Sequence, residues 1–197
     1  KIRKFLFISM VYSKRIDDPA FLKYINNTRK WSIIFSMVIA SIAIIGFYIY
    51  GEISLEMENP DALYIGLGIG SMFILIAIFQ IVSRNSGSTW DGYIIDKKQI
   101  LKKRKINHDN NNSWQEYMEF TVFIKSNQGK MYCITVDDDD TLYNYYKVGD
   151  KIRHHKGLNS YEKYDKSNDT IIFCNACASQ NDIGDESCHR CNCPLLK

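Results

Sequence analysis

Two uncharged stretches decide the fold of this chain: WSIIFSMVIASIAIIGFYIY (31–50) and ALYIGLGIGSMFILIAIFQIVS (62–83). A helix rises about 1.5 Å per residue and the hydrocarbon core of a bilayer is about 30 Å thick, so each stretch is long enough to span it. Helices buried in a soluble core are the alternative, but these usually have a polar face, and the first stretch offers only three serines. We therefore predict a transmembrane helical hairpin over residues 31–83.

The charges that flank the two stretches predict the orientation of the hairpin. Residues 1–30 contain eight basic and two acidic side chains, and residues 84–105 contain seven basic and two acidic ones. The connecting segment 51–61 contains four acidic side chains and no basic one. Because Lys and Arg next to a span are retained on the cytoplasmic side, we expect a multi-pass plasma-membrane protein with both termini in the cytoplasm.

Residues 1–30 are then a cytoplasmic juxtamembrane segment. Its apolar run FLFISMVY (5–12) is too short for a secretory signal, and no small-residue cleavage site follows it. We interpret this run as an interfacial anchor or as a strand packed on the cytoplasmic domain. Asp18 before Pro19 predicts the start of the helix that leads into the first span.

Small residues recur one helical turn apart on both stretches, and such stripes let two helix backbones approach closely. We expect helix packing at Ser36 and Ala40 on the first stretch and at Gly66 and Gly70 on the second. Packing within the hairpin is favoured, because a short loop forces two helices to be antiparallel neighbours. A dimer or partner-subunit surface is the alternative.

Strand and turn patterns replace the apolar stretches between residues 90 and 173. In YMEFTVFIKSNQGKMYCITV (117–136), β-branched and aromatic residues flank the turn residues Asn127-Gln128-Gly129, which predicts a hairpin. Cys133 has apolar neighbours in this hairpin and is expected in the core. The composition of HDNNNS (108–113) predicts a loop.

Two further segments complete the β-rich pattern. VGDKIRHH (148–155) predicts a turn followed by a strand, and DTIIF (169–173) predicts a last strand. About four to six short strands suit a small barrel or sandwich. The V-G-D-K-I turn also resembles the turns of small SH3-like or OB-like barrels, including soluble domains attached to short membrane hairpins in bacteria.

Six basic side chains follow the second stretch and lie on its expected cytoplasmic side: Lys97, Lys98, Lys102, Lys103, Arg104 and Lys105. We interpret them as a membrane-surface or anion-binding site, because anionic lipid headgroups attract each base by about 1 kcal/mol. A solvated strand face is the alternative. Nucleic-acid binding is disfavoured, because residues 106–197 contain 10 basic and 14 acidic side chains.

Five of the six cysteines lie in the last 24 residues, CNACASQNDIGDESCHRCNCPLLK. Two Cys-x2-Cys pairs, Cys174/Cys177 and Cys188/Cys191, have the spacing of a four-cysteine zinc site, in which each pair supplies one edge of a tetrahedron. Disulfides are rare in the reducing cytoplasm, and a thioredoxin-like redox pair requires a βαβ setting. Iron in the same thiolate cage is a further alternative.

Residues 174–197 resemble the C-terminal zinc-ribbon family of bacterial and archaeal proteins. In that family the paired Cys-x2-Cys knuckles are usually followed by Gly, and a Pro-Leu tail ends the second knuckle. Here Ala178 and Asn192 stand where Gly would be, and Pro194-Leu195 fits. His189 and Cys193 are extra, and either can substitute for a ligand. The resemblance implies a structural zinc ion held by four ligands, Cys174, Cys177, Cys188 and Cys191.

The predicted fold class is a membrane α+β protein with four parts. These are the juxtamembrane segment 1–30, the two-helix transmembrane hairpin 31–83, a small cytoplasmic β-barrel or sandwich over 90–173, and a zinc ribbon over 174–197. Four protein ligands leave a metal no open position for a substrate, and no catalytic pattern is found in the sequence. We therefore expect an adaptor or accessory subunit and no enzyme.

The expected adaptor binds a protein partner, or a second copy of the chain, at the cytoplasmic face. Two functions of other classes stay open. One is a small-ligand sensor that signals through association of its transmembrane helices. The other is a membrane-tethered nucleic-acid-binding protein, whose affinity would fall steeply with salt.

Overall fold

The computed structural model describes residues 12–108 and 111–197 and divides them into two compact units. One unit is the helical segment Pro19–Gly87, and the other combines residues 12–18 with Ser88–Lys197. Most of the apolar run expected to form an anchor or strand, residues 5–11, lies outside the described residues.

The helical unit contains α1 (Pro19–Ile53) and α2 (Asp61–Ser86). A short 3-10 helix (Lys14–Asp17) precedes α1, and α1 begins at Pro19 as predicted, because proline has no N–H to leave unpaired in the first turn. Both helices are long and apolar enough to cross a membrane. The predicted spans 31–50 and 62–83 lie within them, so the prediction of two long apolar helices is confirmed.

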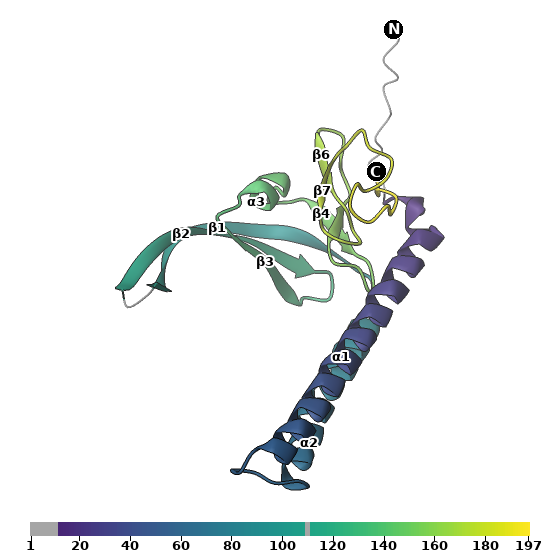
Figure 1. The fold of residues 1–197 in the computed structure, drawn as a ribbon. Helices are drawn as coiled ribbons and strands as arrows, with labels where there is room; N and C mark the ends of the chain where they lie inside the picture. Colours follow the sequence, from purple (N-terminus) through teal and green to yellow (C-terminus); the bar gives the residue numbers. More distant parts are fainter. Residues whose placement is uncertain (1–11, 109–110) are drawn as a thin grey trace. The chain divides into compact units, whose positions relative to one another are not determined.

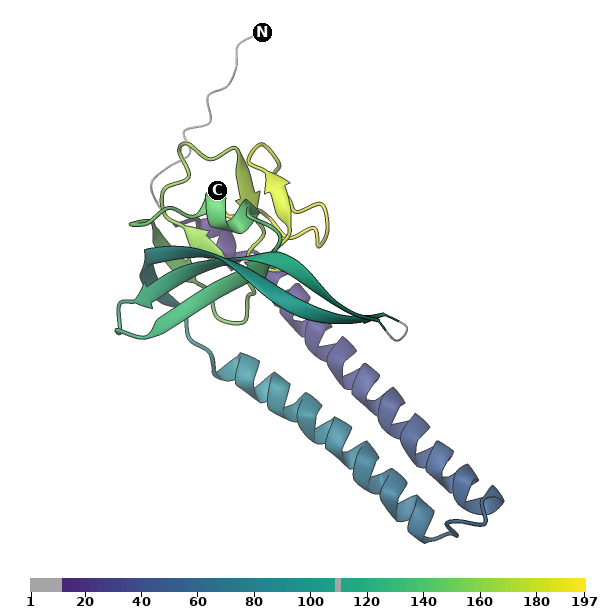
Figure 2. The same ribbon diagram turned by 90° about the vertical axis from the view of Figure 1, so that its left-hand side faces the viewer.

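The two helices lie side by side and antiparallel (Figures 1 and 2). Gly66 and Gly70 are buried on α2, and a Cβ added at Gly66 would lie 2.8 Å from Phe47 Cβ, whereas one at Gly70 would lie 3.2 Å from the Ala40 carbonyl oxygen. Ser36 is buried on α1, as is Ala40. The structure therefore brings the small residues of both helices together inside the hairpin.

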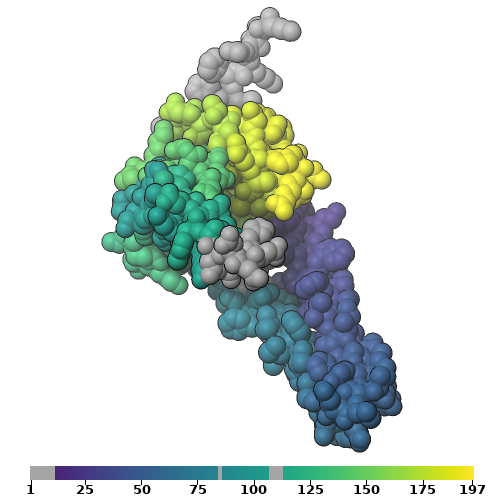
Figure 3. All heavy atoms as spheres, turned by 60° about the vertical axis from the view of Figure 1, so that its left-hand side comes forward, coloured from purple at the N-terminus to yellow at the C-terminus, as the bar shows by residue number. Residues whose placement is uncertain are grey.

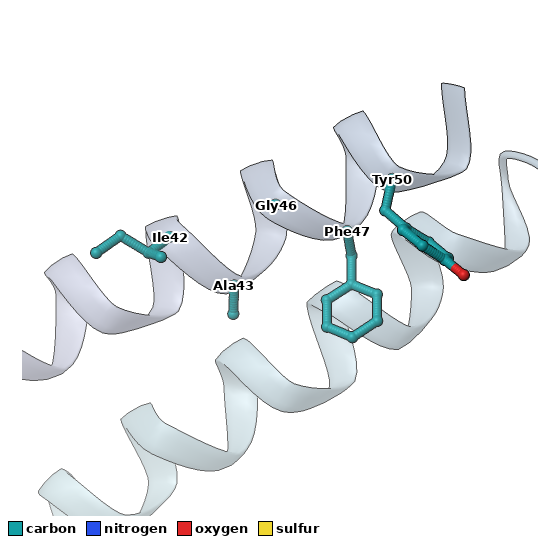
Figure 4. Close-up of a pocket in the computed structure, with 5 residues that line it drawn as sticks. All are labelled: Ile42, Ala43, Gly46, Phe47 and Tyr50. Atoms are coloured by element: carbon teal, nitrogen blue, oxygen red, sulfur yellow. The ribbon is translucent and has the colours of Figure 1, made fainter. Parts of the chain in front are cut away.

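The outer surface of the hairpin is largely apolar and carries a shallow groove on α1. Figure 4 shows Ala43 and Phe47 pointing from α1 toward α2. They share a shallow groove with Ile42, Gly46 and Tyr50.

Five antiparallel strands form the main sheet of the second unit, in the order β3-β2-β1-β4-β5. Two more strands, β6 and β7, form a separate ribbon. The prediction of a β-rich domain is confirmed. The strands are β1 (Trp90–His108), β2 (Asn111–Ser126), β3 (Met131–Asp137), β4 (Lys151–His154), β5 (Tyr161–Lys163), β6 (Ile171–Phe173) and β7 (Gln180–Asp182).

Two turns and a bulge set the register of this sheet. Gly129, with φ of 84°, closes the predicted hairpin between β2 and β3. Between Ile94 and Asp96 the register of β1 against β2 shifts, which leaves one extra residue in β1. The V-G-D turn packs on this bulge: the Gly149 N–H donates to the Ile94 carbonyl at 2.8 Å, and the Ile94 N–H donates to the Asp150 carbonyl at 3.0 Å.

The core of the second unit lies beneath this bulge. Tyr145 and Tyr146 come from the short helix α3 (Thr141–Tyr145) and the residue after it. Phe173 comes from β6, and its ring lies 5.0 Å from that of Tyr145, so the core joins the small ribbon to the main sheet. The buried cluster consists of Ile94, Val122, Ile124, Tyr145, Tyr146, Ile152 and Phe173.

The ring contacts of Trp90 show that the sheet curls. The Trp90 ring stacks on Tyr132 of β3 at 4.4 Å and meets Tyr161 of β5 at 5.7 Å, although these strands are at opposite edges of the pairing order. Among the described strands no backbone ladder joins β3 to β5. The structure thus shows a curled antiparallel sheet, and closure into a barrel stays a prediction.

Two local predictions are wrong. Cys133 is exposed, because on β3 it alternates with Tyr132 and Ile134, which pack against the core. The segment 108–113 is largely strand, since β1 continues to His108 and β2 begins at Asn111. Pairing with the opposite strand outweighs the loop-forming composition of these polar residues.

The glycines of α2 provide a matched test of the helix contact. Gly66→Val is expected to weaken the contact between α1 and α2, because the new side chain collides with Phe47, and overpacking costs about 1–3 kcal/mol. Gly68→Val is the control, because a Cβ at Gly68 meets nothing within 4 Å. The midpoint of SDS-induced unfolding in mixed micelles measures the effect. Equal midpoints for the two variants would contradict this packing.

Candidate metal centre

Four cysteine sulfurs meet in the C-terminal segment, and all lie within 4.8 Å of one another. Cys174 Sγ is 3.5 Å from Cys191 Sγ, and Cys177 Sγ is 3.6 Å from Cys188 Sγ. A tetrahedral ion with bonds of about 2.3 Å requires sulfurs about 3.8 Å apart, so the spacing fits a metal ion. These four cysteines can therefore hold a metal, and they are the same four that the spacing in the sequence predicts.

The two Cys-x2-Cys turns have the same backbone geometry. The Ala178 N–H donates to the Cys174 carbonyl at 2.8 Å, and the Asn192 N–H donates to the Cys188 carbonyl at 2.9 Å. Ala178 has φ of 60° and Asn192 has φ of 58°, both in the left-handed region. These are the positions at which the zinc-ribbon family usually has Gly, so the chain forms both turns without the residue that adopts this conformation most easily.

Hydrogen bonds surround the buried sulfurs. The Ser179 hydroxyl lies 3.1 Å from both Cys177 Sγ and Cys188 Sγ, and the Arg190 N–H donates to Cys188 Sγ at 3.4 Å. Burial raises the pKa of Cys174 to about 12. Burial also acts to raise the pKa of Cys188, but the hydrogen bonds outweigh it and lower that pKa to about 6. The surroundings therefore favour a thiolate at Cys188, the form that binds metals.

The two extra candidates lie outside the four-sulfur group. Both the N–H and the Nδ1 atom of His189 contact Asn181 Oδ1, at 3.0 and 2.8 Å. Cys193 is buried, and its carbonyl accepts a hydrogen bond from the Cys188 N–H at 2.8 Å. In the described part of the chain the structure groups four sulfurs and leaves His189 and Cys193 in supporting positions.

The four-cysteine cluster belongs to the same unit as the main sheet. Figure 3 shows the C-terminal residues, in yellow, directly beside the yellow-green residues that precede them. The Asn175 carbonyl, next to Cys174, accepts from the N–H groups of Asn159 and Ser160 at 2.9 and 3.1 Å. Arg15 forms a 2.7 Å ion pair with Glu186. Residues far apart in the sequence thus hold the cysteine turns in place.

A buried cluster of ionisable side chains lies on β5 and on the loops that follow β4 and β5. Glu162, His155 and Lys166 are each less than 7% exposed. The Glu162 carboxylate lies 2.7 Å from His155 Nε2 and 2.8 Å from Lys166 Nζ, and it accepts from the Ser13 N–H at 2.6 Å. Sequence reasoning missed this cluster, for which the four-residue spacing of Glu162 and Lys166 is the only local signal. The cluster attaches the segment before α1 to the sheet.

The six bases predicted to form a surface site all lie on β1. Because successive side chains of a strand point to opposite faces, the six bases are divided between the two faces of β1 and do not form one patch. Lys97 lies over the Tyr143 ring at 3.9 Å. Lys98 and Lys105 both have exposed side chains. The remaining three form ion pairs, Lys102 with Glu119 at 2.6 Å, Lys103 with Glu116 at 2.9 Å and Arg104 with Asp138 at 3.9 Å.

Comparison of the chain with family models, with curated proteins and with solved structures finds no match. No family match therefore supports the resemblance of residues 174–197 to zinc ribbons. What supports it is the geometry of the four cysteines, which is consistent with a zinc-ribbon-like segment.

Removal of one cysteine pair tests the metal centre. In Cys174→Ser with Cys177→Ser, the C-terminal segment should lose its resistance to protease while the helices remain, because metal-binding energy is folding energy for so small a unit. Limited proteolysis and metal analysis of the full chain measure both effects. Cys133→Ser, at an exposed cysteine on β3, is the matched control. A fully protease-resistant double variant would show that the segment folds without metal.

The buried cluster predicts a loss of stability in acid. Burial acts to raise the pKa of Glu162, but His155, Lys166 and the Ser13 N–H outweigh it and lower that pKa below its usual 4.5. The ionised group therefore stabilises the fold above pH 4.5, and this contribution is lost as the pH falls below that value.

Glu162→Gln is expected to cost about 3–5 kcal/mol at neutral pH, because it leaves Lys166 buried without its counter-charge. It should also make the stability of the fold depend less on pH below about pH 4.5. Thermal unfolding of the full chain between pH 7 and pH 3 measures both. Glu116→Gln is the control, because its ion pair with Lys103 is exposed, and such pairs contribute about 0–1 kcal/mol. A Glu162→Gln curve parallel to the wild type would refute this role for the carboxylate.

Proposed function

We propose that this chain is a membrane-anchored adaptor that binds a protein partner at the cytoplasmic face through its β-domain and a structural zinc ribbon. The observation that carries the proposal is the closed four-cysteine centre. A metal ion with four protein ligands has no open position for water or substrate, so its role is to stabilise a small folded surface. A domain of this kind acts by binding.

The exposure of α1 and α2 supports insertion in a membrane. Within the most apolar windows of the two helices, only 11% and 17% of the residues are buried. A core helix of a soluble protein is mostly buried, whereas a span exposes its apolar side chains to lipid. The cation-rich segments that flank the two apolar spans, residues 1–30 and 84–105, then favour the plasma membrane with both termini in the cytoplasm.

Zinc is the metal that this site and this compartment favour. Tetrahedral thiolate sites hold zinc or iron, and zinc is the usual ion of small structural ribbons with four cysteines. The proposed cytoplasmic location keeps cysteines reduced, which is the state in which they bind a metal. The four ligands proposed are Cys174, Cys177, Cys188 and Cys191.

The interior of the β-domain supports a binding role over a ligand-sensing one. Its core is filled by seven buried side chains, and the buried Glu162 carboxylate is bonded to both His155 and Lys166. The outer surface, in contrast, presents apolar side chains at Tyr93, Ile95 and Val148, which are 45%, 41% and 61% exposed. Exposed apolar side chains of this kind suit contact with another protein.

Purification of the tagged full chain in mild detergent tests the proposal. We expect a stoichiometric protein to co-purify with the wild type and with Cys133→Ser, and to be lost in Cys174→Ser with Cys177→Ser. Purification of the wild type alone would refute the adaptor. Recovery of nucleic acid in place of a protein, or of a bound small molecule, would establish one of the two other functions instead.

A further inference from the structure

Beyond residue 100, β1 and β2 leave the sheet as a two-stranded arm. Pairing of β2 with β3 begins at Glu119, and pairing of β4 with β1 is confined to residues 90–93. Residues 101–108 and 111–118 therefore form a strand ladder only with one another in the described chain, and at the base of this ladder Met118 also exchanges hydrogen bonds with Asp138. We call these residues the arm, and Figures 1 and 2 show it projecting past the end of β3.

The two faces of the arm differ in chemistry. Directly opposed residues share a face, and the pairs Leu101–Met118, Lys103–Glu116 and Lys105–Trp114 form one of them. We call it the tryptophan face. The opposite face carries Lys102, which is paired with Glu119, and Arg104, which lies 5.1 Å from the Tyr117 ring.

The tryptophan face exposes apolar groups beside bases. Trp114 is 67% exposed and Leu101 is 56% exposed, because a two-stranded arm has no core in which to bury them. Indole rings favour the boundary between hydrocarbon and water, and lysine reaches from apolar surface to charged headgroups. Trp and Lys on one face of a ribbon therefore match the chemistry of a lipid surface.

The strand that carries the arm follows α2 after a short connection, and the arm is basic. Only residues 87–89 lie between the end of α2 at Ser86 and the start of β1 at Trp90, which allows at most about 14 Å. Residues 101–118 contain four basic and two acidic side chains, so the arm complements an anionic surface. A nucleic acid fits less well, because residues 106–197 as a whole are acidic in balance.

We propose that the tryptophan face of the arm binds anionic lipid headgroups, with Trp114 at the interface and Lys103 and Lys105 on the headgroups. This inference rests on the membrane location in the proposed function. It assigns the lipid contact to two of the six bases of β1, and it excludes Lys102 and Arg104, which lie on the opposite face of the arm. The ion pair of Lys103 with Glu116 is exposed and contributes only about 0–1 kcal/mol, so a headgroup can replace Glu116 as the partner of Lys103.

Fluorescence of the full chain in lipid vesicles tests the inference. The emission of Trp114 is obtained as the difference between the wild type and Trp114→Phe, which removes the signals of Trp31 and Trp90. In vesicles of phosphatidylcholine with brominated phosphatidylglycerol, we expect this emission to be quenched about twofold or more. In vesicles of brominated phosphatidylcholine alone, we expect much weaker quenching.

Two double variants with the same loss of charge separate the faces. Lys103→Gln with Lys105→Gln should abolish the quenching, whereas Lys98→Gln with Lys102→Gln should retain it. Flotation of the vesicles at high salt reports insertion of the helices independently. Protein that floats without quenching of Trp114, or equal losses in the two variants, would overturn the inference. Protein that does not float would instead refute the membrane location.

Addition of a short DNA duplex to the phosphatidylcholine vesicles tests nucleic acid as the alternative partner of the arm. We expect it to leave the emission of Trp114 unchanged. A change with DNA, together with no quenching by brominated anionic lipid, would assign the arm to nucleic acid and overturn the inference.

Discussion

Backbone pairing along β1 is the interaction on which the C-terminal unit depends. This one strand pairs with β2 over almost its whole length and with β4 at its start. Its bulge at residues 94–96 receives both hydrogen bonds of the V-G-D turn, which places Ile94 in the core and Ile95 at the surface. The later strands and the cysteine turns take their positions from this arrangement.

Charge pairing inside the unit has a second role, which is to join short segments that are far apart in the sequence. Glu162 joins the Ser13 backbone to Lys166 and His155, and Glu186 joins Arg15 to the cysteine segment. Glu162 and Lys166 are buried, and because buried charges are costly to remove from water, each requires the other, whereas the Arg15–Glu186 pair is exposed and contributes little. The short segment before α1 is thus tied both to the sheet and to the metal-binding segment.

Much of the fold follows from the sequence, and so does the composition of the candidate site. The two uncharged helices, the hairpin at Gly129, the turn at Gly149 and the four grouped cysteines are all predicted correctly. Each depends on residues close together in the chain, through length, turn chemistry or ligand spacing. The errors at Cys133 and at residues 108–113 arise where partners from a distant strand decide which face is covered and how far a strand extends.

The sequence by itself determined that the chain has two helices of membrane-spanning length and a segment able to bind a metal, because both are properties of local composition and spacing. Only the tertiary structure decided that Gly66 and Gly70 pack within the hairpin, that Glu162 is enclosed by His155 and Lys166, and that Trp114 shares an exposed face with Lys103 and Lys105. These features depend on the register of strands and helices that meet across long stretches of sequence. Register is set by the packing of the whole unit, which no single segment specifies.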